Sequence, residues 1–349
     1  MLEEVRLTTF SHGAGCACKL GPSDLTTVLG LLDAPAMPEE VLVSAETGDD
    51  AAVWRLPDGR ALIATVDVFT PIVDDPFDWG RIAATNAFSD VYAMGGSPAF
   101  ALNVAGWPVD DLPLELLGHV MRGGQEIAAA AGAVVLGGHT ITATEPIYGM
   151  VAVGFVDESD LGRNSTAAPG ERLFLTKPIG TGLIATAIKR EVATVEQAEA
   201  AVRAMTTLNA AGASAMVQAG TAAATDVTGF GLLGHLRKLL EASDVAAVVH
   251  ADAVPLLPGV LDLARADVVA GGTKRNHAWL QATTDWGELT PPEQIVLADA
   301  QTSGGLLIAT RHADALTTAL GQRGVQHAEI GEVVAGPAGR IAVTGRVSE

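Results

Sequence analysis

The stretch RIAATNAFSD, residues 81–90, lies within a largely apolar helical pattern that runs from residue 79 to residue 94 and stops at a glycine pair. Two of its polar residues, Asn86 and Asp90, are four positions apart, so on a helix they share one face. An aspartate that only caps or turns the chain stands at the end of an element, whereas Asp90 stands inside one. We therefore predict a helix that presents Asn86 and Asp90 to a functional site.

Strand and helix patterns mix on both sides of this helix. Apolar runs at 51–56 and 61–66, joined by Pro57, Asp58 and Gly59, predict a hairpin. Because the spacing is not that of regular βαβ units, we expect an α+β fold rather than one doubly wound sheet. Further strands are expected at 99–104, 133–136, 147–156, 172–176, 245–250 and 305–310, and helices at 23–32, 112–131, after 182, within 194–220 and at 232–242.

The length of 349 residues suits two domains. A glycine- and cysteine-containing segment precedes them, and we expect residues 1–45 to form a mobile leader. Residues 164–170 have the composition of a linker. They divide the rest of the chain into an N-terminal domain, residues 46–163, and a C-terminal α+β domain, residues 164–349.

The charge balance and the lack of long apolar segments exclude several functions. The chain has 41 acidic and 21 basic residues, a net charge of −20, so we expect no nucleic-acid or anionic-membrane binding. The longest uncharged stretches are interrupted by glycine, proline and polar residues, so no membrane span is expected. The first ten residues lack the pattern of a secretory signal. The only two cysteines, Cys16 and Cys18, cannot form a disulfide framework, and a cytoplasmic location is expected.

Both cysteines lie in the segment SHGAGCACK, residues 11–19. Its glycines make the backbone permissive, so we expect a reachable thiol. Lys19, three residues from Cys16, favours the thiolate, which is the nucleophilic form. A metal-binding Cys-x-Cys that includes His12 is an alternative, but tetrahedral zinc needs a further ligand and the chain has no second cysteine pair.

A second group of candidates consists of aspartates at places where the chain turns. Asp50 precedes a strand, Asp67 follows one, and Asp226 opens a polar break before a helix. Capping and turn formation explain most such aspartates, and suffice for Asp67 alone. Together with Asp90, they form a set of carboxylates of the kind that binds Mg²⁺ at nucleotide phosphates. A metal is required between the carboxylates and the phosphates because like charges repel.

A third candidate is the run Gly137-Gly138-His139-Thr140, which follows the expected strand 133–136. We expect a turn whose backbone N–H groups hold phosphate, although such a glycine pair is more often a plain turn. The sequence has no P-loop and no dinucleotide fingerprint. Binding of ATP would therefore depend on carboxylates, metal and backbone.

Together these features resemble the selenophosphate synthetase (selenide, water dikinase) family over nearly the whole chain. The aspartate and glycine motifs alone fit the wider superfamily that includes aminoimidazole ribonucleotide synthetase and thiamine monophosphate kinase. The Cys-x-Cys-Lys leader narrows the resemblance to the selenium enzymes. The matching segments are SHGAGCACK (11–19), DDAAV (49–53), RIAATNAFSD (81–90), GGHT (137–140), TDVTGFGLLGH (225–235), GGTKRN (271–276) and QTSGG (301–305).

The resemblance implies a two-domain subunit of the aminoimidazole ribonucleotide synthetase-like type, paired as a homodimer, with ATP, metal and dimer contacts in residues 46–163. It implies that ATP, selenide and water give selenophosphate, AMP and orthophosphate. Cys16 and Lys19 are implied as the catalytic pair, and Mg²⁺ as the cofactor, bound by Asp50, Asp90 and Asp226. The implied nucleotide contacts are Lys19, Thr47, Gly48, Asp49, Asp67 and Asp90, with Gly138, His139 and Thr140 from the partner subunit.

The resemblance has two departures and leaves several alternatives open. Ala17 stands where many relatives have glycine, and Ala300 where a proline is usual. Cys16 attacks phosphate, carries selenium or only positions it, and the roles of Cys18 and His12, the number of metal ions, a K⁺ requirement and the selenium donor are open. One alternative function is another ATP-dependent synthetase or kinase that releases ADP. A non-catalytic protein that binds selenium or a soft metal on Cys16 and Cys18 is the other.

Overall fold

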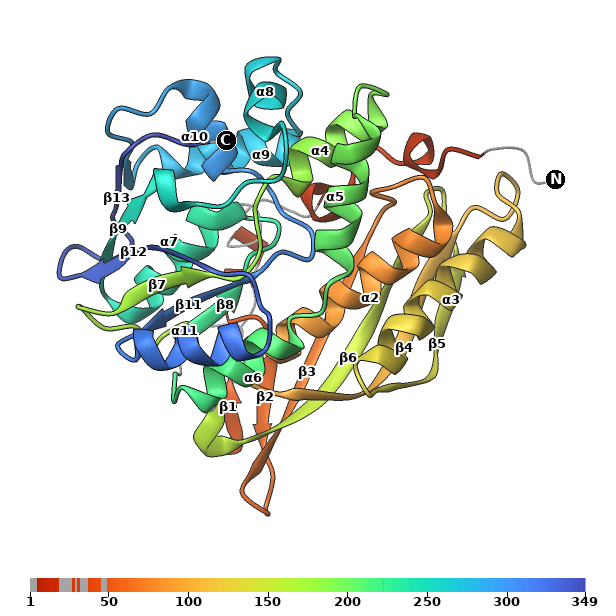
Figure 1. Ribbon diagram of the computed structural model, residues 1–349. Coiled ribbons are helices and arrows are strands. Elements are labelled where there is room, and N and C mark those ends of the chain that lie inside the picture. The colour runs from red at the N-terminus through yellow and green to blue at the C-terminus, as the bar shows by residue number, and fades with distance from the viewer. Residues whose placement is uncertain are drawn as a thin grey trace.

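The computed structural model describes residues 5–18, 27–28, 30–31, 37–44, 49–221 and 223–348. Within them the chain forms two mixed sheets with helices packed against them, and the two units lie side by side (Figure 1). The expected α+β architecture of two layered units is confirmed. The helix expected at 23–32 falls largely outside the described residues.

The first sheet consists of β1 (Val41–Val43), β2 (Ala52–Arg55), β3 (Arg60–Phe69), β4 (Ser97–Trp107), β5 (Val134–Thr142) and β6 (Ile147–Asp157). Its strand order is β1-β2-β3-β6-β4-β5. Neighbouring strands are antiparallel except β4 and β5, which are parallel and joined by α3 (Leu114–Ala130). Helices α2 (Pro76–Ala93) and α3 cover the same face of this sheet (Figure 1). The hairpin expected around Asp58 is confirmed as β2 and β3.

The second sheet has the strand order β10-β13-β9-β12-β7-β11-β8. The strands are β7 (Arg172–Leu175), β8 (Ala223–Asp226), β9 (Ala246–His250), β10 (Thr284–Asp285), β11 (Leu306–Thr310), β12 (Ala328–Val334) and β13 (Ile341–Thr344). The helices are α4 (Thr181–Lys189), α5 (Val195–Thr206), α6 (Ala210–Gln218), α7 (Gly231–Ser243), α8 (Val260–Arg265), α9 (Gly271–Leu280), α10 (Pro291–Leu297) and α11 (Ala313–Gln322).

The expected strands and helices of this half are present, and the sequence patterns missed others. The helical region 194–220 is divided into α5 and α6. The alanine-rich β8 was not expected as a strand. It is one because it pairs with β11, an interior strand of the sheet, and such pairing outweighs the weak strand propensity of alanine.

Helix α2 is the element that both units share. Pro76 occupies its first turn, and the Asp75 side chain caps it by accepting a hydrogen bond from the Asp78 amide. The chain is buried at every position from 82 to 94, because α2 packs on β3 and β6 and also contacts α5, α6 and β8. A helix that is covered on all sides tolerates apolar residues all round. The contact between α2 and β8 sets the position of the candidate site.

The face of the first sheet that α2 and α3 do not cover carries exposed apolar side chains. Side chains alternate along a strand, so Val66 points away from the α2 side, which Thr65 and Asp67 face. Val66 is 63% exposed, and Leu136 on the edge strand β5 is 65% exposed. Other exposed apolar side chains of these strands are Trp54, Val134 and Ile141.

The described part of the leader docks on the body of the protein. Arg6 forms ion pairs with Asp74 and Glu191. The Lys189 ammonium, at the end of α4, donates hydrogen bonds to the carbonyl groups of Ser11 (2.5 Å) and Gly13 (3.0 Å). These contacts join residues 5–18 to both units.

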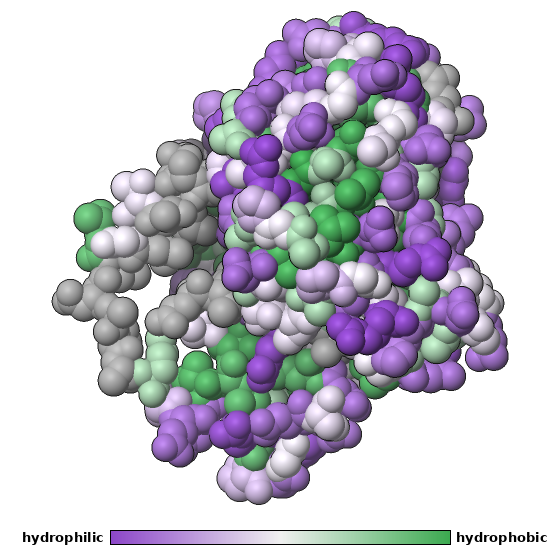
Figure 2. All heavy atoms as spheres, turned by 90° about the vertical axis from the view of Figure 1, so that its left-hand side faces the viewer, coloured by the Kyte–Doolittle hydropathy of each residue, from purple (hydrophilic) through white to green (hydrophobic). Residues whose placement is uncertain are grey.

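The face of the molecule seen in Figure 2 carries mostly hydrophilic residues. Viewed from the left-hand side of Figure 1, hydrophobic residues gather in a central strip and in a lower patch between polar ones (Figure 2). Among the helices in the described residues, none has the length and apolar character needed to cross a bilayer.

Candidate active site

Four aspartates from different segments of the chain lie near one another at α2, close enough for their charges to interact. Asp90 lies on α2, Asp67 on β3, Asp226 at the end of β8, and Asp50 just before β2. Asp67, Asp90 and Asp226 are 6%, 9% and 1% exposed, and Asp50 is half-buried. Residues that are far apart in the sequence thus form one carboxylate cluster, named here the aspartate cluster, because α2 packs against both β3 and β8.

The aspartate cluster is electrostatically strained. Burial raises the pKa of Asp90 well above its ordinary value, and the charges of the other three aspartates of the cluster raise it further. Burial also raises the pKa of Asp50, followed by the charge of Asp226. A bound cation reverses this effect, because it favours the charged form of each carboxylate.

The donor atoms of the aspartate cluster suit a hard divalent cation. Asp50 Oδ1 accepts a hydrogen bond from the Thr225 hydroxyl (2.8 Å), whereas the buried Oδ2 of Asp50 has no hydrogen-bond partner among the described residues. Mg²⁺ prefers such carboxylate oxygens. In the part of the chain that the structure describes, no three His, Cys, Asp or Glu side chains are already grouped to hold a metal ion. The residues fit Mg²⁺ by their chemistry, and binding requires their side chains to converge.

Asn86 connects the aspartate cluster to the leader. Its Nδ2 donates a hydrogen bond to Asp67, and Asp90, one turn later on α2, accepts one from the Thr65 hydroxyl at 2.5 Å. Asn86 Oδ1 accepts from the Ser303 amide (2.7 Å) and faces the Cys16 thiol at 3.6 Å. The predicted face of α2 with Asn86 and Asp90 is therefore present, and both side chains are buried.

Cys16 is buried, and the expectation of a reachable thiol is wrong for this structure. It lies in a 3₁₀ turn, η2 (Gly15–Cys18), and is 1% exposed. Its amide donates a hydrogen bond to the Thr302 hydroxyl at 3.0 Å. A Cβ on Gly229 would approach the Cys16 carbonyl oxygen to 3.1 Å. Within the leader segment, a Cβ on Gly15 would lie 2.5 Å from the Thr302 hydroxyl oxygen, so this glycine allows close packing and does not leave the segment exposed.

Other predicted site residues lie outside the described residues or away from the aspartate cluster. Lys19, Thr47 and Gly48 are outside the described residues, as is the side chain of Cys18. Asp49 is described, and its Oδ1 accepts a hydrogen bond from the Asn164 amide at 2.7 Å. His12 contacts Glu145 through an exposed imidazole.

The turn expected at residues 137–140 is wrong, because these residues lie inside strand β5. Gly138 pairs with Asn103 of β4, and a Cβ on Gly138 would lie 2.0 Å from the Asn103 carbonyl oxygen. Glycine here permits close approach of two strands. β5 is three strand positions from β3, or roughly 14 Å, so within one described chain Gly138, His139 and Thr140 stay apart from Asp67.

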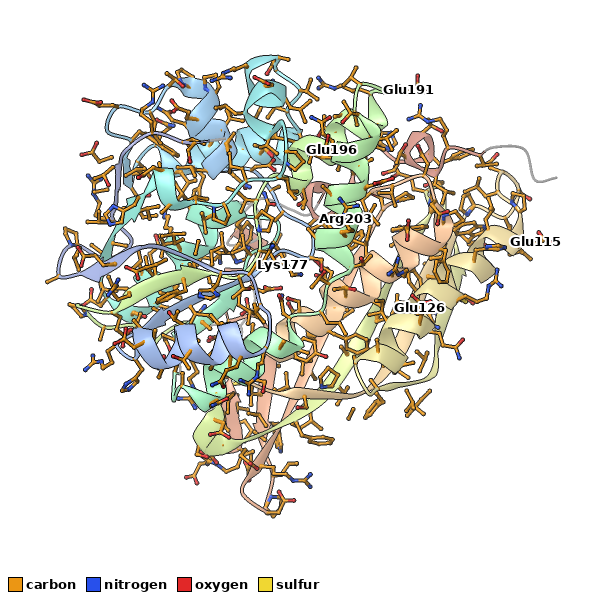
Figure 3. The ribbon with its side chains drawn as sticks, in the orientation of Figure 1. Glu115, Glu126, Lys177, Glu191, Glu196 and Arg203 are labelled. Atoms are coloured by element: carbon orange, nitrogen blue, oxygen red, sulfur yellow. The ribbon has the colours of Figure 1, made fainter. Side chains whose placement is uncertain are left out.

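Lys177 is a candidate that the sequence patterns missed. It is 7% exposed, and its ammonium donates a hydrogen bond to the Ser303 carbonyl at 2.9 Å. Burial lowers the pKa of Lys177 to about 7, against the opposing effect of the Asp226 charge. Lys177 and Arg203 of α5 (Figure 3) line a cavity of about 530 Å³ whose lining residues all belong to the second unit. The sequence signal for Lys177 is a lysine that stands two residues after the end of a largely buried strand, β7.

Asp299 and Ala300 hold in place the loop whose Thr302 contacts Cys16. Asp299 Oδ2 accepts from the amides of Gly182 and Leu183 at the start of α4. The next residue, Ala300, donates its N–H to the Thr273 hydroxyl at 3.1 Å. A proline has no N–H to donate, so the departure at Ala300 adds a hydrogen bond to the loop.

Comparisons with known proteins agree with this architecture. The family model "AIR synthase related protein, N-terminal domain" matches residues 48–156, and "AIR synthase related protein, C-terminal domain" matches residues 168–344. A solved thiamine-monophosphate kinase from Stenotrophomonas maltophilia K279a superposes with a TM-score of 0.64 at 20% identity, over 95% of this chain and 98% of that chain. This likeness shows the fold alone.

Two curated relatives are much closer in sequence. "Selenide, water dikinase" of Shewanella sp. (strain MR-7) is 46% identical over 311 residues, which are 88% of this chain and 87% of the relative. "Selenide, water dikinase" of Escherichia coli O139:H28 (strain E24377A / ETEC) is 44% identical over 341 residues, 97% of this chain and 98% of the relative. At this identity and coverage, the chain belongs to the selenide, water dikinase family.

Proposed function

We propose that this chain is a selenide, water dikinase, which uses ATP, selenide and water to make selenophosphate, AMP and orthophosphate. The observation that carries the proposal is 44% identity over 97% of the chain to a relative of that name. Release of AMP together with two phosphorus products requires that both phosphoanhydride bonds of ATP break. One phosphoryl group goes to selenide and the other to water.

The geometry around α2 supports a phosphoryl-transfer site. Asp67 and Cys16 contact the same amide, that of Asn86, so the aspartate cluster and the thiol belong to one site. Asn86 orients both groups. Burial of Cys16 against Asn86 and Thr302 also excludes water from the thiol, which protects a reactive selenium species from hydrolysis or loss.

We assign Asp50, Asp90 and Asp226 as Mg²⁺ ligands. Their mutual repulsion and the unpartnered Oδ2 of Asp50 support this assignment. Bound Mg²⁺ supplies positive charge that allows the nucleotide phosphates to approach the carboxylates. Asp67, and Asp90 from α2, are assigned to the same nucleotide site, and Asp49 to its edge.

We assign Cys16 and Lys19 as the catalytic pair. Cys16 supplies a soft sulfur nucleophile or selenium-binding group, and Lys19 supplies a cation in a chain of net charge −20. Lys19 also contacts the nucleotide in this proposal, as do Thr47 and Gly48. These three residues lie outside the described residues.

We propose that the active form is a homodimer, with Gly138, His139 and Thr140 reaching the nucleotide of the partner subunit. The exposed apolar face of the first sheet supports a dimer, because apolar patches and edge strands of this kind mark interaction surfaces. Trp54, Val66, Leu136 and Ile141 contribute to it.

The absence of a disulfide framework supports a cytoplasmic location.

The experiment that tests the function is ³¹P NMR of the protein with ATP, Mg²⁺ and selenide under anaerobic conditions. We expect AMP, orthophosphate and selenophosphate to appear together. Formation of ADP with one phosphorus product would favour the alternative synthetase or kinase. No consumption of ATP would favour a selenium- or soft-metal-binding protein.

A further inference from the structure

Ser303 adopts a backbone conformation that a serine avoids. Its φ angle is +50°, in the left-handed region where residues with a Cβ are uncommon and glycine is preferred. Ser303 lies between Thr302, which holds Cys16, and the glycine pair that leads into β11. Strain of this kind gathers at functional sites, where the surrounding structure maintains it.

The side chain of Ser303 adds a second unfavourable feature. Ser303 is 1% exposed, and its hydroxyl oxygen has no hydrogen-bond partner among the described residues. A buried hydroxyl is normally paired, because burial removes its hydrogen bonds to water. Glycine at position 303 would remove both the strain and the unpaired hydroxyl. The serine is therefore not explained by folding alone.

The rest of the residue is firmly held. The Ser303 amide donates to Asn86 Oδ1 at 2.7 Å, and its carbonyl accepts from Lys177 at 2.9 Å. A Cβ on the next residue, Gly304, would come within 2.1 Å of the Val227 carbonyl oxygen, so the loop packs closely there. The backbone contacts on both sides keep the hydroxyl in place without using it.

Its position is beside the leader thiol. Asn86 Oδ1 accepts from the Ser303 amide and also faces the Cys16 thiol, so Ser303 and Cys16 meet on one oxygen atom. The protein groups on the other side of Asn86 are carboxylates, which accept hydrogen bonds and repel anions. The Ser303 hydroxyl, in contrast, can donate a hydrogen bond to an anion bound at this position.

We propose that the Ser303 hydroxyl is a substrate-binding group that donates a hydrogen bond to the hydroselenide anion held beside Cys16. This assignment rests on the proposed function. The hydroxyl gives the anion a fixed donor, because the Ser303 amide and carbonyl are both held by hydrogen bonds. The nucleotide phosphates are the other anionic acceptor that would fit the same donor, and the test separates the two.

The test compares Ser303→Gly and Ser303→Ala with the wild-type chain. Three quantities are measured: the Michaelis constant for selenide, kcat for AMP release, and the dissociation constant of a non-hydrolysable ATP analogue. Because glycine accepts a positive φ, Ser303→Gly should unfold at an unchanged or higher urea concentration. We expect its KM for selenide to rise at least tenfold, with a smaller change in kcat and an unchanged nucleotide affinity. Ser303→Ala should show the same KM increase with a stability below that of Ser303→Gly, because alanine keeps a Cβ at the positive φ.

The matched control is Asp244→Gly, which also places glycine at a left-handed position, φ +55°, at the end of α7. It should leave KM for selenide unchanged. An unchanged selenide KM in Ser303→Gly overturns the assignment while an active wild type preserves the proposed function. A weakened nucleotide affinity with normal selenide KM assigns the hydroxyl to the phosphates and also overturns it. A wild-type chain that makes no selenophosphate refutes the proposed function and this assignment with it.

Discussion

The Cys16 thiol meets the side chain of Asn86 in the interior of the protein, with Sγ 3.6 Å from Oδ1. The two residues are 70 positions apart in the sequence. One comes from the leader and the other from α2, so this contact attaches the leader to the helix that carries Asp90. The reactivity of the Cys16 thiol therefore reports whether the leader is packed against α2.

Thiol labelling tests this contact. In a Cys18→Ser background, we expect Ellman's reagent to modify Cys16 at least tenfold more slowly in the native protein than in urea, because the thiol is buried. Asn86→Ala should accelerate the reaction and cost about 1–3 kcal/mol of unfolding free energy, since it leaves the Ser303 amide unpaired. The control Asn209→Ala removes another buried amide, which bonds Ser89 and Gly304. Equal labelling rates in the two variants would contradict the role given to Asn86.

Replacement of Asp50 by asparagine tests the metal assignment. The change keeps the size of the side chain and the acceptor for the Thr225 hydroxyl, but it removes one charge from the aspartate cluster. We expect a folded protein that loses most of its ATP turnover at limiting Mg²⁺. The control is Asp58→Asn in the β2–β3 turn, where the carboxylate pairs only with Arg60 among the described residues. Wild-type turnover of Asp50→Asn under these conditions would exclude Asp50 as a ligand.

Variants of the leader test the catalytic pair. Lys19→Ala should reduce selenophosphate formation by roughly a hundredfold, because electrostatic stabilisation of a developing charge is often worth about 3 kcal/mol. Nucleotide affinity should change little. Cys16→Ser should abolish the reaction, since a hydroxyl is a far weaker nucleophile than a thiolate, and Cys18→Ser should be milder. AMP release that depends on selenide is the measurement. An inactive Cys18→Ser with an active Cys16→Ser would exchange the roles of the two cysteines.

A charge on the open sheet face tests the dimer. Leu136→Glu places a carboxylate on an exposed apolar position of β5, and we expect it to give monomers with little ATP turnover. Val195→Glu, at an exposed apolar position of α5 that is 76% exposed, should stay dimeric and active. Sedimentation velocity and activity are measured over the same dilution series. A fully active monomer would refute the contribution of Gly138, His139 and Thr140 across the dimer.

The stability of the second unit should depend on pH through Glu293. Burial by itself would raise the pKa of this carboxyl, but hydrogen bonds from Arg346 and Thr290 outweigh burial and lower the pKa to about 2, from an ordinary 4.5. A lowered pKa in the folded state stabilises the fold above pH 4.5, and this contribution is lost as the pH falls towards 2. The unfolding free energies of wild type and Glu293→Gln, measured in urea, should therefore converge by about 1.6 kcal/mol between pH 4.5 and pH 3.

The control for this experiment is Glu196→Gln, an exposed carboxylate at the start of α5. Its difference from the wild type should stay constant over the same pH range. A constant difference for Glu293→Gln as well would show that the contact between Arg346 and Glu293 contributes nothing to stability.

Local patterns were sufficient for the elements whose partners are close in sequence. The helical period predicted α2 and the shared face of Asn86 and Asp90, and the Pro-Asp-Gly run predicted the hairpin of β2 and β3. The same reasoning ended strand β5 too early, because Gly137 and Gly138 are typical of turns. Pairing with β4 overrides that preference, and such pairing is a tertiary effect.

Long-range contacts determine the rest of the site. The buried Cys16 donates its amide to Thr302, which is 286 positions away in the sequence. A local sequence pattern gives no information on a contact over that separation. Ser303 was missed for the same reason, since its backbone is held by Lys177 and by Asn86, both far away in the sequence. The composition of the leader predicts a reactive thiol, which stays a prediction, and it gave no information on the burial of Cys16.

Helix α2 is encoded in the first half of the chain and is packed by both halves. Each of its buried positions must suit the first sheet on one side and α5, α6 and β8 on the other. A substitution on this helix must therefore be compatible with two sets of neighbouring side chains. A change of residue in one half of the chain then requires a matching change in the other half. Exchange of a single half with a distant relative would leave α2 mismatched, so the two halves are expected to coevolve and to be inherited as one unit.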